Sequence, residues 1–200
     1  TPTLFAHADS LHDRIAPLLG RLGMKAPRDD REDDTAEYDL ALLGVHRTAS
    51  SLLHELAVSA PGVLRRTVAV DFNVGIHRDI EAMGPRVVYG DLTSPETLRH
   101  AGVDRARVVL CTIPDAVLSS ATTVGVVRML RQLNRSAIVI ATATTFPEQV
   151  RLYAAGADFV LMPRVQAAVA AQDAVQAALS GHLAELRASG APSPRREVLE

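Results

Sequence analysis

The chain has 200 residues, of which 48% are hydrophobic, and it carries 21 lysine and arginine residues against 23 aspartate and glutamate residues. This length fits one domain with appendages, and the apolar content is enough for a sizeable core, which excludes a disordered chain. The formal charge of −2 argues against general nucleic-acid binding, which needs an excess of basic residues.

Residues 1–37 are expected to connect this domain to another part of a longer protein. Apolar residues from Leu4 to Leu22 have the spacing of a short amphipathic helix, and the acidic run "RDDREDDTAE" that follows indicates a solvated linker. Because the chain begins at Thr1 rather than at methionine and ends in a Leu-Glu pair typical of cloning, we expect it to be an excised fragment.

Six short apolar runs, each followed by a helical pattern, predict the domain at residues 38–162. The runs lack polar alternation, as expected for strands that are covered on both faces. "TSPE" and "TFPE" combine a hydroxyl cap, an early proline and a glutamate, which are signals of a helix start. We therefore predict a Rossmann-like, doubly wound α/β fold with six parallel strands. The runs are residues 39–44, 67–71, 86–89, 107–113, 137–142 and 158–162.

The turn after the first run has the form of a dinucleotide-binding turn with one departure. Gly44 fills the first glycine position and Ala49 the third, but His46 stands at the second, where a phosphate approaches the backbone. Arg47 and Thr48 offer a charge and a hydroxyl to an anion at a helix N-terminus, as does Ser50. Two alternatives stay open: an anion site that includes His46, or a simple turn with an exposed histidine.

Acidic residues follow the next three strands at the same predicted sheet edge. Asp71 and its neighbour Phe72 end the second strand, where an acidic side chain accepts ribose hydroxyls in such folds. Asp91 and Leu92 follow the third strand, and Asp115 follows the fourth, near the expected reversal of strand order. Each aspartate has an alternative structural role, in a turn or as a helix cap.

Residues 163–187 predict one long alanine-rich helix with a narrow apolar stripe, formed by Val165, Val169, Val175 and Leu179. Such a stripe suits packing against another helix, and we expect two copies of the chain to form a homodimer through it. The remaining residues, 188–200, are predicted to be a disordered tail with a cloning scar.

The later residues resemble the regulator-of-potassium-conductance domain, also called the TrkA-N or potassium-transport nucleotide-binding domain. "VVYGDLTSPETLRHAGVDRARVVLCTIPD" matches the family pattern at seven positions, and "QVRLYAAGADFVLMP" is similar to the family's ending. The seven matches are Gly90, Asp91, Leu98, Ala101, Gly102, Ala106 and Asp115; the ending is matched by Leu152, Gly156, Ala157, Asp158, Val160 and Pro163. The resemblance covers about residues 38–181.

The flanks are similar to the Kef-type branch, which consists of potassium (monovalent cation):proton antiporters. The resemblance implies a regulatory domain at the cytoplasmic face of the bacterial inner membrane, with an N-terminal transmembrane antiporter domain and a homodimer as partners. It implies NAD(H), AMP or another adenine nucleotide as ligand, although the degenerate turn leaves an empty site as an alternative. The family's arginine after the fifth strand, implicated in glutathione recognition, is replaced by Thr142.

An enzyme of the same fold is the other hypothesis considered. A short dehydrogenase or epimerase often pairs a tyrosine with a lysine four residues on, whereas Lys25 is the only lysine and lies outside the sheet region. No nucleophile-elbow motif is present, and the seven histidines are scattered without a metal-ligand spacing. The sequence therefore favours a non-catalytic regulator, with a ligand-free dimerisation scaffold as a third possibility.

Overall fold

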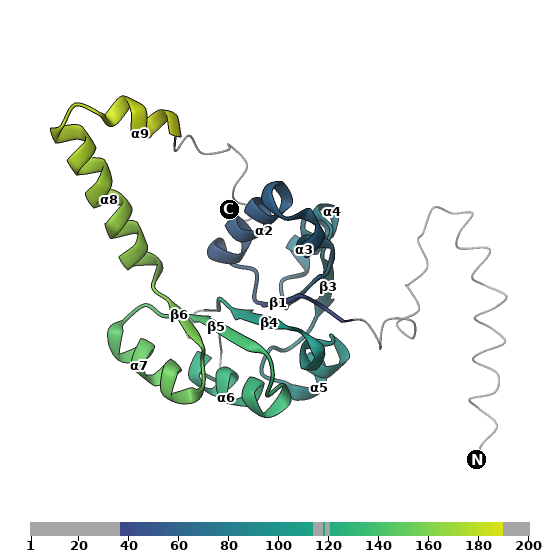
Figure 1. The fold of residues 1–200 in the computed structure, drawn as a ribbon. Coiled ribbons are helices and arrows are strands. Elements are labelled where there is room, and N and C mark those ends of the chain that lie inside the picture. Colours follow the sequence, from purple (N-terminus) through teal and green to yellow (C-terminus); the bar gives the residue numbers. More distant parts are fainter. Residues whose placement is uncertain (1–36, 114–117, 119–120, 190–200) are drawn as a thin grey trace, which may run out of the picture. The chain divides into compact units, whose positions relative to one another are not determined.

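The computed structural model describes residues 37–113, 118 and 121–189 (Figure 1). The chain divides into two compact units, residues 1–35 and 36–200, and all described residues belong to the second. The predicted N-terminal helix and nearly all of the acidic linker lie outside the described residues, and so does most of the predicted tail.

One six-stranded parallel sheet forms the centre of the domain, as predicted. Its spatial order is β3-β2-β1-β4-β5-β6, so the order reverses between the neighbours β1 and β4. Each strand lies within the apolar run that predicted it. The strands are β1 (Leu40–Leu43), β2 (Thr67–Asp71), β3 (Arg86–Tyr89), β4 (Val108–Cys111), β5 (Ile138–Thr142) and β6 (Phe159–Leu161).

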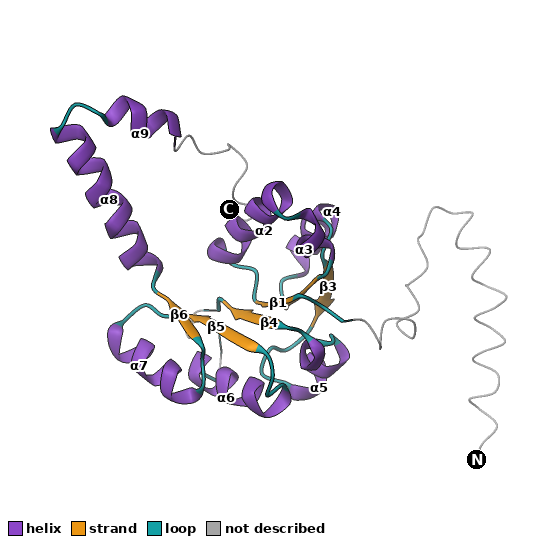
Figure 2. Ribbon diagram, viewed as in Figure 1, coloured by secondary structure: helices purple, strands orange, loops and turns teal. Residues whose placement is uncertain are grey.

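Helices cover both faces of this sheet, with α2, α3 and α4 on one face and α5, α6 and α7 on the other (Figure 2). Among the described residues, two 3-10 helices complete the connections. The elements are α2 (Arg47–Ser59), α3 (Pro61–Arg65), η2 (Val74–Ile76), α4 (His77–Met83), α5 (Pro95–His100), η3 (Val103–Arg105), α6 (Thr123–Leu133) and α7 (Phe146–Ala155). The sequence pattern does not predict the short α3, which lies between α2 and the second strand.

The two faces explain why the strands are apolar without alternation. Leu42 packs in a buried cluster with Leu53 of α2, whereas its neighbour Leu43 packs in a second cluster with Leu130 of α6 and Leu152 of α7. Successive side chains of a strand point to opposite faces, so both positions need an apolar residue when both faces are covered.

Hydroxyl caps start several helices where the sequence indicates them. The side chain of Ser94 accepts a hydrogen bond from the Thr97 N–H at the start of α5, and that of Thr145 accepts one from the Glu148 N–H at the start of α7. The "TSPE" and "TFPE" signals are thus confirmed, because each places a side-chain oxygen against a first-turn donor that has no acceptor within the helix.

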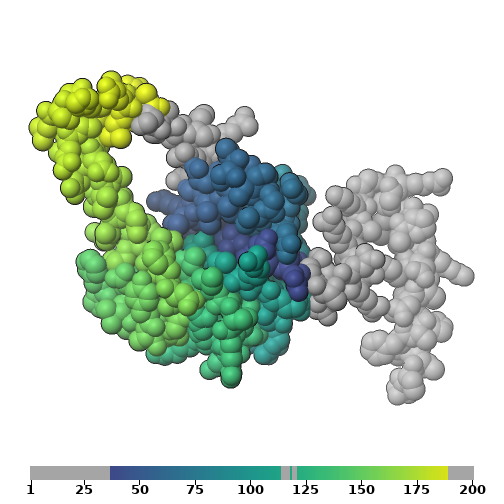
Figure 3. Space-filling model, viewed as in Figure 1, coloured from purple at the N-terminus to yellow at the C-terminus, as the bar shows by residue number. Residues whose placement is uncertain are grey.

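The predicted single helix after the sixth strand is divided in two, α8 (Pro163–Leu179) and α9 (Leu183–Ser189). Gly181 adopts φ +82°, and the His182 N–H donates to the Ala177 carbonyl at 2.8 Å, the hydrogen bond of a Schellman C-cap. No residue of α8 is buried, and α8 and α9 are the yellow-green and yellow elements in Figure 3. Among the described helices, none is long and apolar enough to cross a membrane.

Candidate functional site

The carboxyl edge of the sheet at β1 and β4 is the candidate site. Parallel strands deliver their following loops to one edge, and ligands of open α/β sheets bind where the strand order reverses. Here that place lies between β1 and β4. The predicted site residues follow β1, β2, β3 and β4, so the topology brings their loops to this edge.

Gly44 makes the close turn that begins this site. Its φ is +76°, and a Cβ atom at this position would lie 2.0 Å from Ile113 Cγ1, a contact far too short for a side chain. The Thr112 hydroxyl donates to the Gly44 carbonyl at 2.6 Å. The turn after β1 is therefore packed directly against the chain leaving β4, and this is possible because residue 44 is glycine.

His46 is the N-cap of α2, and its Nδ1 accepts a hydrogen bond from the Arg47 N–H at 2.8 Å. The side chains of His46 and Arg47 are exposed, and Thr48 is half-buried. Ala49 is fully buried, which fits the small residue expected at the third glycine position, where helix and sheet pack closely. Ser50 is also fully buried, so its hydroxyl lies in the helix–sheet packing rather than at an open anion site.

Asp71 connects the end of β2 to the turn after β1. The side chain is only 5% exposed; Oδ2 accepts the Val45 N–H at 2.6 Å, and Oδ1 accepts the Asn73 N–H at 2.7 Å. These bonds use about two of the roughly four lone-pair positions of a carboxylate. Asp71 therefore holds the glycine turn in place and still has acceptor capacity for ribose hydroxyls.

The other predicted residues divide between the surface and the core. Phe72 is 49% exposed beside this edge, whereas Leu92 is 2% exposed and belongs to the core. Burial makes Leu92 a packing residue of the core, and its part in binding a cofactor stays a prediction. Asp115 lies outside the described residues.

Asp91 is held in a local turn. Its Oδ1 accepts hydrogen bonds from the N–H and the hydroxyl of Thr93, each at 2.8 Å. The Thr93 N–H, and after it the Thr93 hydroxyl, lower the pKa of Asp91 below its usual 3.8. This arrangement fits the turn-stabilising alternative and leaves Oδ2 for a ligand.

Thr142 ends β5 at the same edge and is half-buried. Beyond it, buried Glu148 accepts the N–H and the hydroxyl of Thr144, at 2.8 and 2.9 Å, which fixes the loop into α7. Within residues 37–113, 118 and 121–189, no cluster of histidine, cysteine, aspartate or glutamate residues could hold a metal ion.

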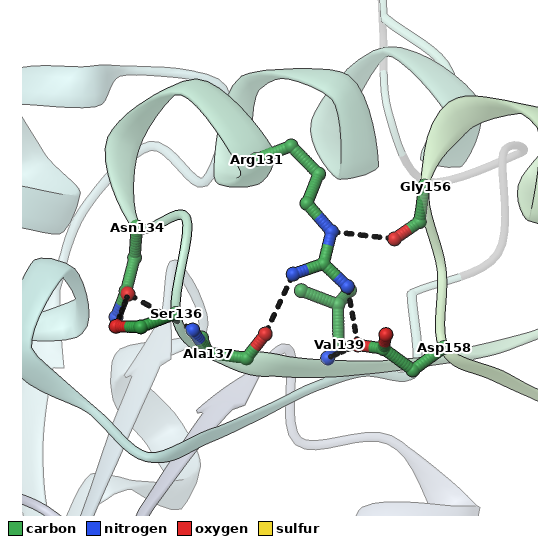
Figure 4. A network of polar contacts seen from close by, with 7 residues as sticks. All are labelled: Arg131, Asn134, Ser136, Ala137, Val139, Gly156 and Asp158. Atoms are coloured by element: carbon green, nitrogen blue, oxygen red, sulfur yellow. Dashed lines mark hydrogen bonds and ion pairs between the residues drawn. The ribbon is translucent and has the colours of Figure 1, made fainter.

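A polar network that the sequence did not predict connects α6, β5 and β6 (Figure 4). Arg131 donates from Nε to the Gly156 carbonyl at 2.5 Å, from Nη1 to the Ala137 carbonyl at 2.6 Å, and from Nη2 to Asp158. Asp158 also accepts the Val139 N–H at 2.7 Å. The sequence motif Gly156-Ala157-Asp158 supplies two of the acceptors in this network, but nothing in the sequence identified Arg131 as the donor.

Burial of the Asp158 carboxylate raises its pKa, but the Val139 N–H and the Arg131 guanidinium together outweigh this effect. The pKa of Asp158 therefore lies below its usual 3.8. The network lies at the amino ends of β5 and β6, opposite the candidate site, so its role is to hold the sheet together.

Comparison with known proteins gives one family and one fold. Residues 40–163 match the TrkA-N domain family, and no match is found among curated protein sequences. The TrkA-N domain of inner membrane protein YbaL from Escherichia coli is 23% identical, with a TM-score of 0.59 over 70% of this chain and 97% of that chain.

Two structures of GsuK have the same fold. The GsuK channel bound to NAD is 23% identical, with a TM-score of 0.54 over 76% of this chain and 27% of that chain. GsuK bound to ADP is 21% identical, with a TM-score of 0.53 over 64% of this chain and 32% of that chain. The chain thus spans about a third or less of these GsuK chains.

Proposed function

Because the chain belongs to the TrkA-N family, we propose that it is a regulatory, non-catalytic domain that binds an adenine nucleotide and controls a cation transporter. The observation that carries the proposal is the turn after β1, which Asp71 holds through the Val45 N–H at the reversal of strand order. A preformed turn at a helix N-terminus suits a ligand with a phosphate group, and a carboxylate beside it suits the ribose.

NAD(H), AMP and ADP are the ligands that this proposal favours. The solved GsuK structures bound to NAD and to ADP have the same fold, which supports an adenine nucleotide as the class of ligand. Exposed Phe72 and the remaining acceptor positions of Asp71 and Asp91 are the groups that would contact the nucleoside.

A Kef-type potassium:proton antiporter is the proposed context, with an N-terminal transmembrane domain of the same protein as partner. The domain would then lie at the cytoplasmic face of the bacterial inner membrane. Glutathione gating is not part of the proposal, because Thr142 cannot supply the positive charge of the family's arginine.

A homodimer through α8 completes the proposal. None of the residues of α8 is buried, and four large apolar side chains, Val165, Val169, Val175 and Leu179, are exposed along it. Covering them with a second copy would remove apolar surface from water. Ligand binding can act on the transporter only through a difference in affinity between two arrangements of the dimer.

The absence of a lysine from residues 26–200 supports a non-catalytic role. Tyr89 and Tyr153 are exposed in part, but Tyr153 binds the Val160 N–H of the edge strand β6 through its hydroxyl oxygen at 3.3 Å. A hydride-transfer enzyme of this fold needs an acid or base beside the nicotinamide, and neither tyrosine has a lysine partner.

Calorimetry and thermal unfolding with NAD, NADH, AMP, ADP and ATP test this function. A ligand at about 100 times its dissociation constant should stabilise the fold by about 2.7 kcal/mol. Asp71→Ala should abolish the effect at a temperature where the variant is folded, while the exposed Asp79→Ala on α4 should not. If no nucleotide binds at millimolar concentration, the domain is a dimerisation scaffold instead; hydride transfer by the isolated chain would indicate an enzyme.

A further inference from the structure

The imidazole of His46 lies at the start of α2, where its Nδ1 accepts the Arg47 N–H. We propose that His46 is a specificity-determining residue, whose imidazole competes with the ligand's phosphate for the first turn of α2. This inference rests on the proposed nucleotide site and concerns which ligands that site accepts.

The competition follows from the hydrogen bond at the start of α2. The first N–H groups of a helix have no acceptor within the helix, and they are the donors that bind phosphate. Nδ1 of His46 accepts the first of them, the Arg47 N–H, at 2.8 Å. A phosphate that binds this donor must first displace the ring.

The backbone at His46 does not itself require a glycine. Its φ of −104° and ψ of −175° are ordinary extended values, and the preceding Val45 N–H is fixed by Asp71. Removing the His46 side chain should therefore leave the turn in place and uncover a donor. Glycine is also well tolerated at a helix N-cap, so this change should cost little stability.

Nδ1 of His46 also has no proton to donate to a phosphate. A ring nitrogen that accepts a hydrogen bond carries no proton, so Nδ1 gives a phosphate nothing to bind in this arrangement. Arg47 follows His46 in the chain, Asp71 binds the N–H of the preceding Val45, and Asp115 lies outside the described residues. A ligand without phosphate does not need the Arg47 N–H, so its affinity should be independent of His46.

Calorimetry with adenosine, ADP and NADH on the whole chain separates these effects. His46→Gly should bind ADP and NADH about fivefold more tightly than the parent, which corresponds to one typical helix cap. His46→Asp still caps the helix but adds a negative charge, so it should bind both ligands more weakly. Adenosine should bind all three proteins equally, and His100→Gln at the end of α5 should behave like the parent.

Each outcome decides the inference. Equal binding of ADP by the parent and His46→Gly overturns it while leaving the proposed function intact. Adenosine affinity that changes in step with ADP affinity also overturns it, because His46 would then act through the fold. If only His46→Gly binds ADP and NADH, the inference is supported, and the chain with His46 does not sense nucleotides. If neither the parent nor any variant binds them, both the inference and the proposed function are wrong.

Discussion

At the residue scale, Gly44 is the described glycine at which an added Cβ atom would make the shortest contact. Gly44→Ala places a Cβ atom against Ile113 and forces a side chain into a positive-φ backbone. Overpacking costs about 1–3 kcal/mol and the left-handed conformation about 1–2 kcal/mol, so we expect a loss of at least about 2 kcal/mol in the free energy of unfolding. Urea denaturation measures it.

Gly62→Ala is the matched control, because residue 62 lies in α3 and, apart from its chain neighbours and the backbone of α3, no atom lies within 4 Å of the place that its Cβ atom would take. This variant should be as stable as the parent or slightly more so, by up to about 1 kcal/mol. Equal stability of Gly44→Ala and the parent would contradict the packing of the turn against Ile113.

Asp71 is the second residue whose role is local and measurable. Asp71→Asn keeps one acceptor oxygen but directs an NH₂ group at one of the two N–H donors, of Val45 or Asn73. Leaving a buried donor without an acceptor costs about 1–3 kcal/mol. Amide hydrogen exchange should show faster exchange at Val45 or at Asn73, whereas Asp79→Asn on the exposed face of α4 should leave both unchanged.

At the element scale, the network around Arg131 fixes α6 to the amino ends of β5 and β6. Arg131→Met keeps most of the apolar side chain but removes the donors to Gly156, Ala137 and Asp158. We expect a loss of about 2–4 kcal/mol, because two carbonyls and a carboxylate lose their partner. Arg128→Met, on the exposed side of the same helix, should lose less than about 0.5 kcal/mol.

The same network predicts a dependence of stability on pH. The pKa of Asp158 is lower in the folded protein than the usual 3.8, so the folded state binds this proton less readily than the unfolded chain. The carboxylate therefore contributes its full stabilisation above pH 3.8 and loses it as the pH falls through the folded value. The difference in urea midpoint between the parent and Asp158→Asn should shrink on going from about pH 7 to pH 3.

At the scale of the whole molecule, the proposed homodimer depends on the exposed apolar side chains of α8. Leu179 is 85% exposed at the end of α8, so a charge there disturbs no packing within one chain. Leu179→Asp should weaken the proposed dimer by about 2 kcal/mol or more, without lowering the stability of the monomer. Sedimentation measures the association. Ala178→Asp, on a neighbouring face of α8, is the control. Equal association of Leu179→Asp and the parent would exclude this surface as the dimer interface.

The sequence alone was enough to predict the sheet, because covered strands need apolar residues at every position. Leu42 and Leu43 face opposite helix layers, and this is why the run that contains them shows no alternation. The helix caps at Ser94 and Thr145 could also be predicted from the sequence, since a cap depends on residues three apart in the chain. The break between α8 and α9 also had a local signal, Gly181, but the alanine-rich sequence around it favoured the prediction of one continuous helix.

Contacts between residues far apart in the chain were decided by the tertiary structure alone. Asp71 binds the Val45 N–H across 26 positions, and Arg131 binds Asp158 across 27. The local sequence pattern predicts the helices and strands, because their hydrophobic periodicity repeats within a few residues. The partner of such a side chain depends on strand order and packing, and so the tertiary structure alone shows that Asp71 holds the turn after β1 in place.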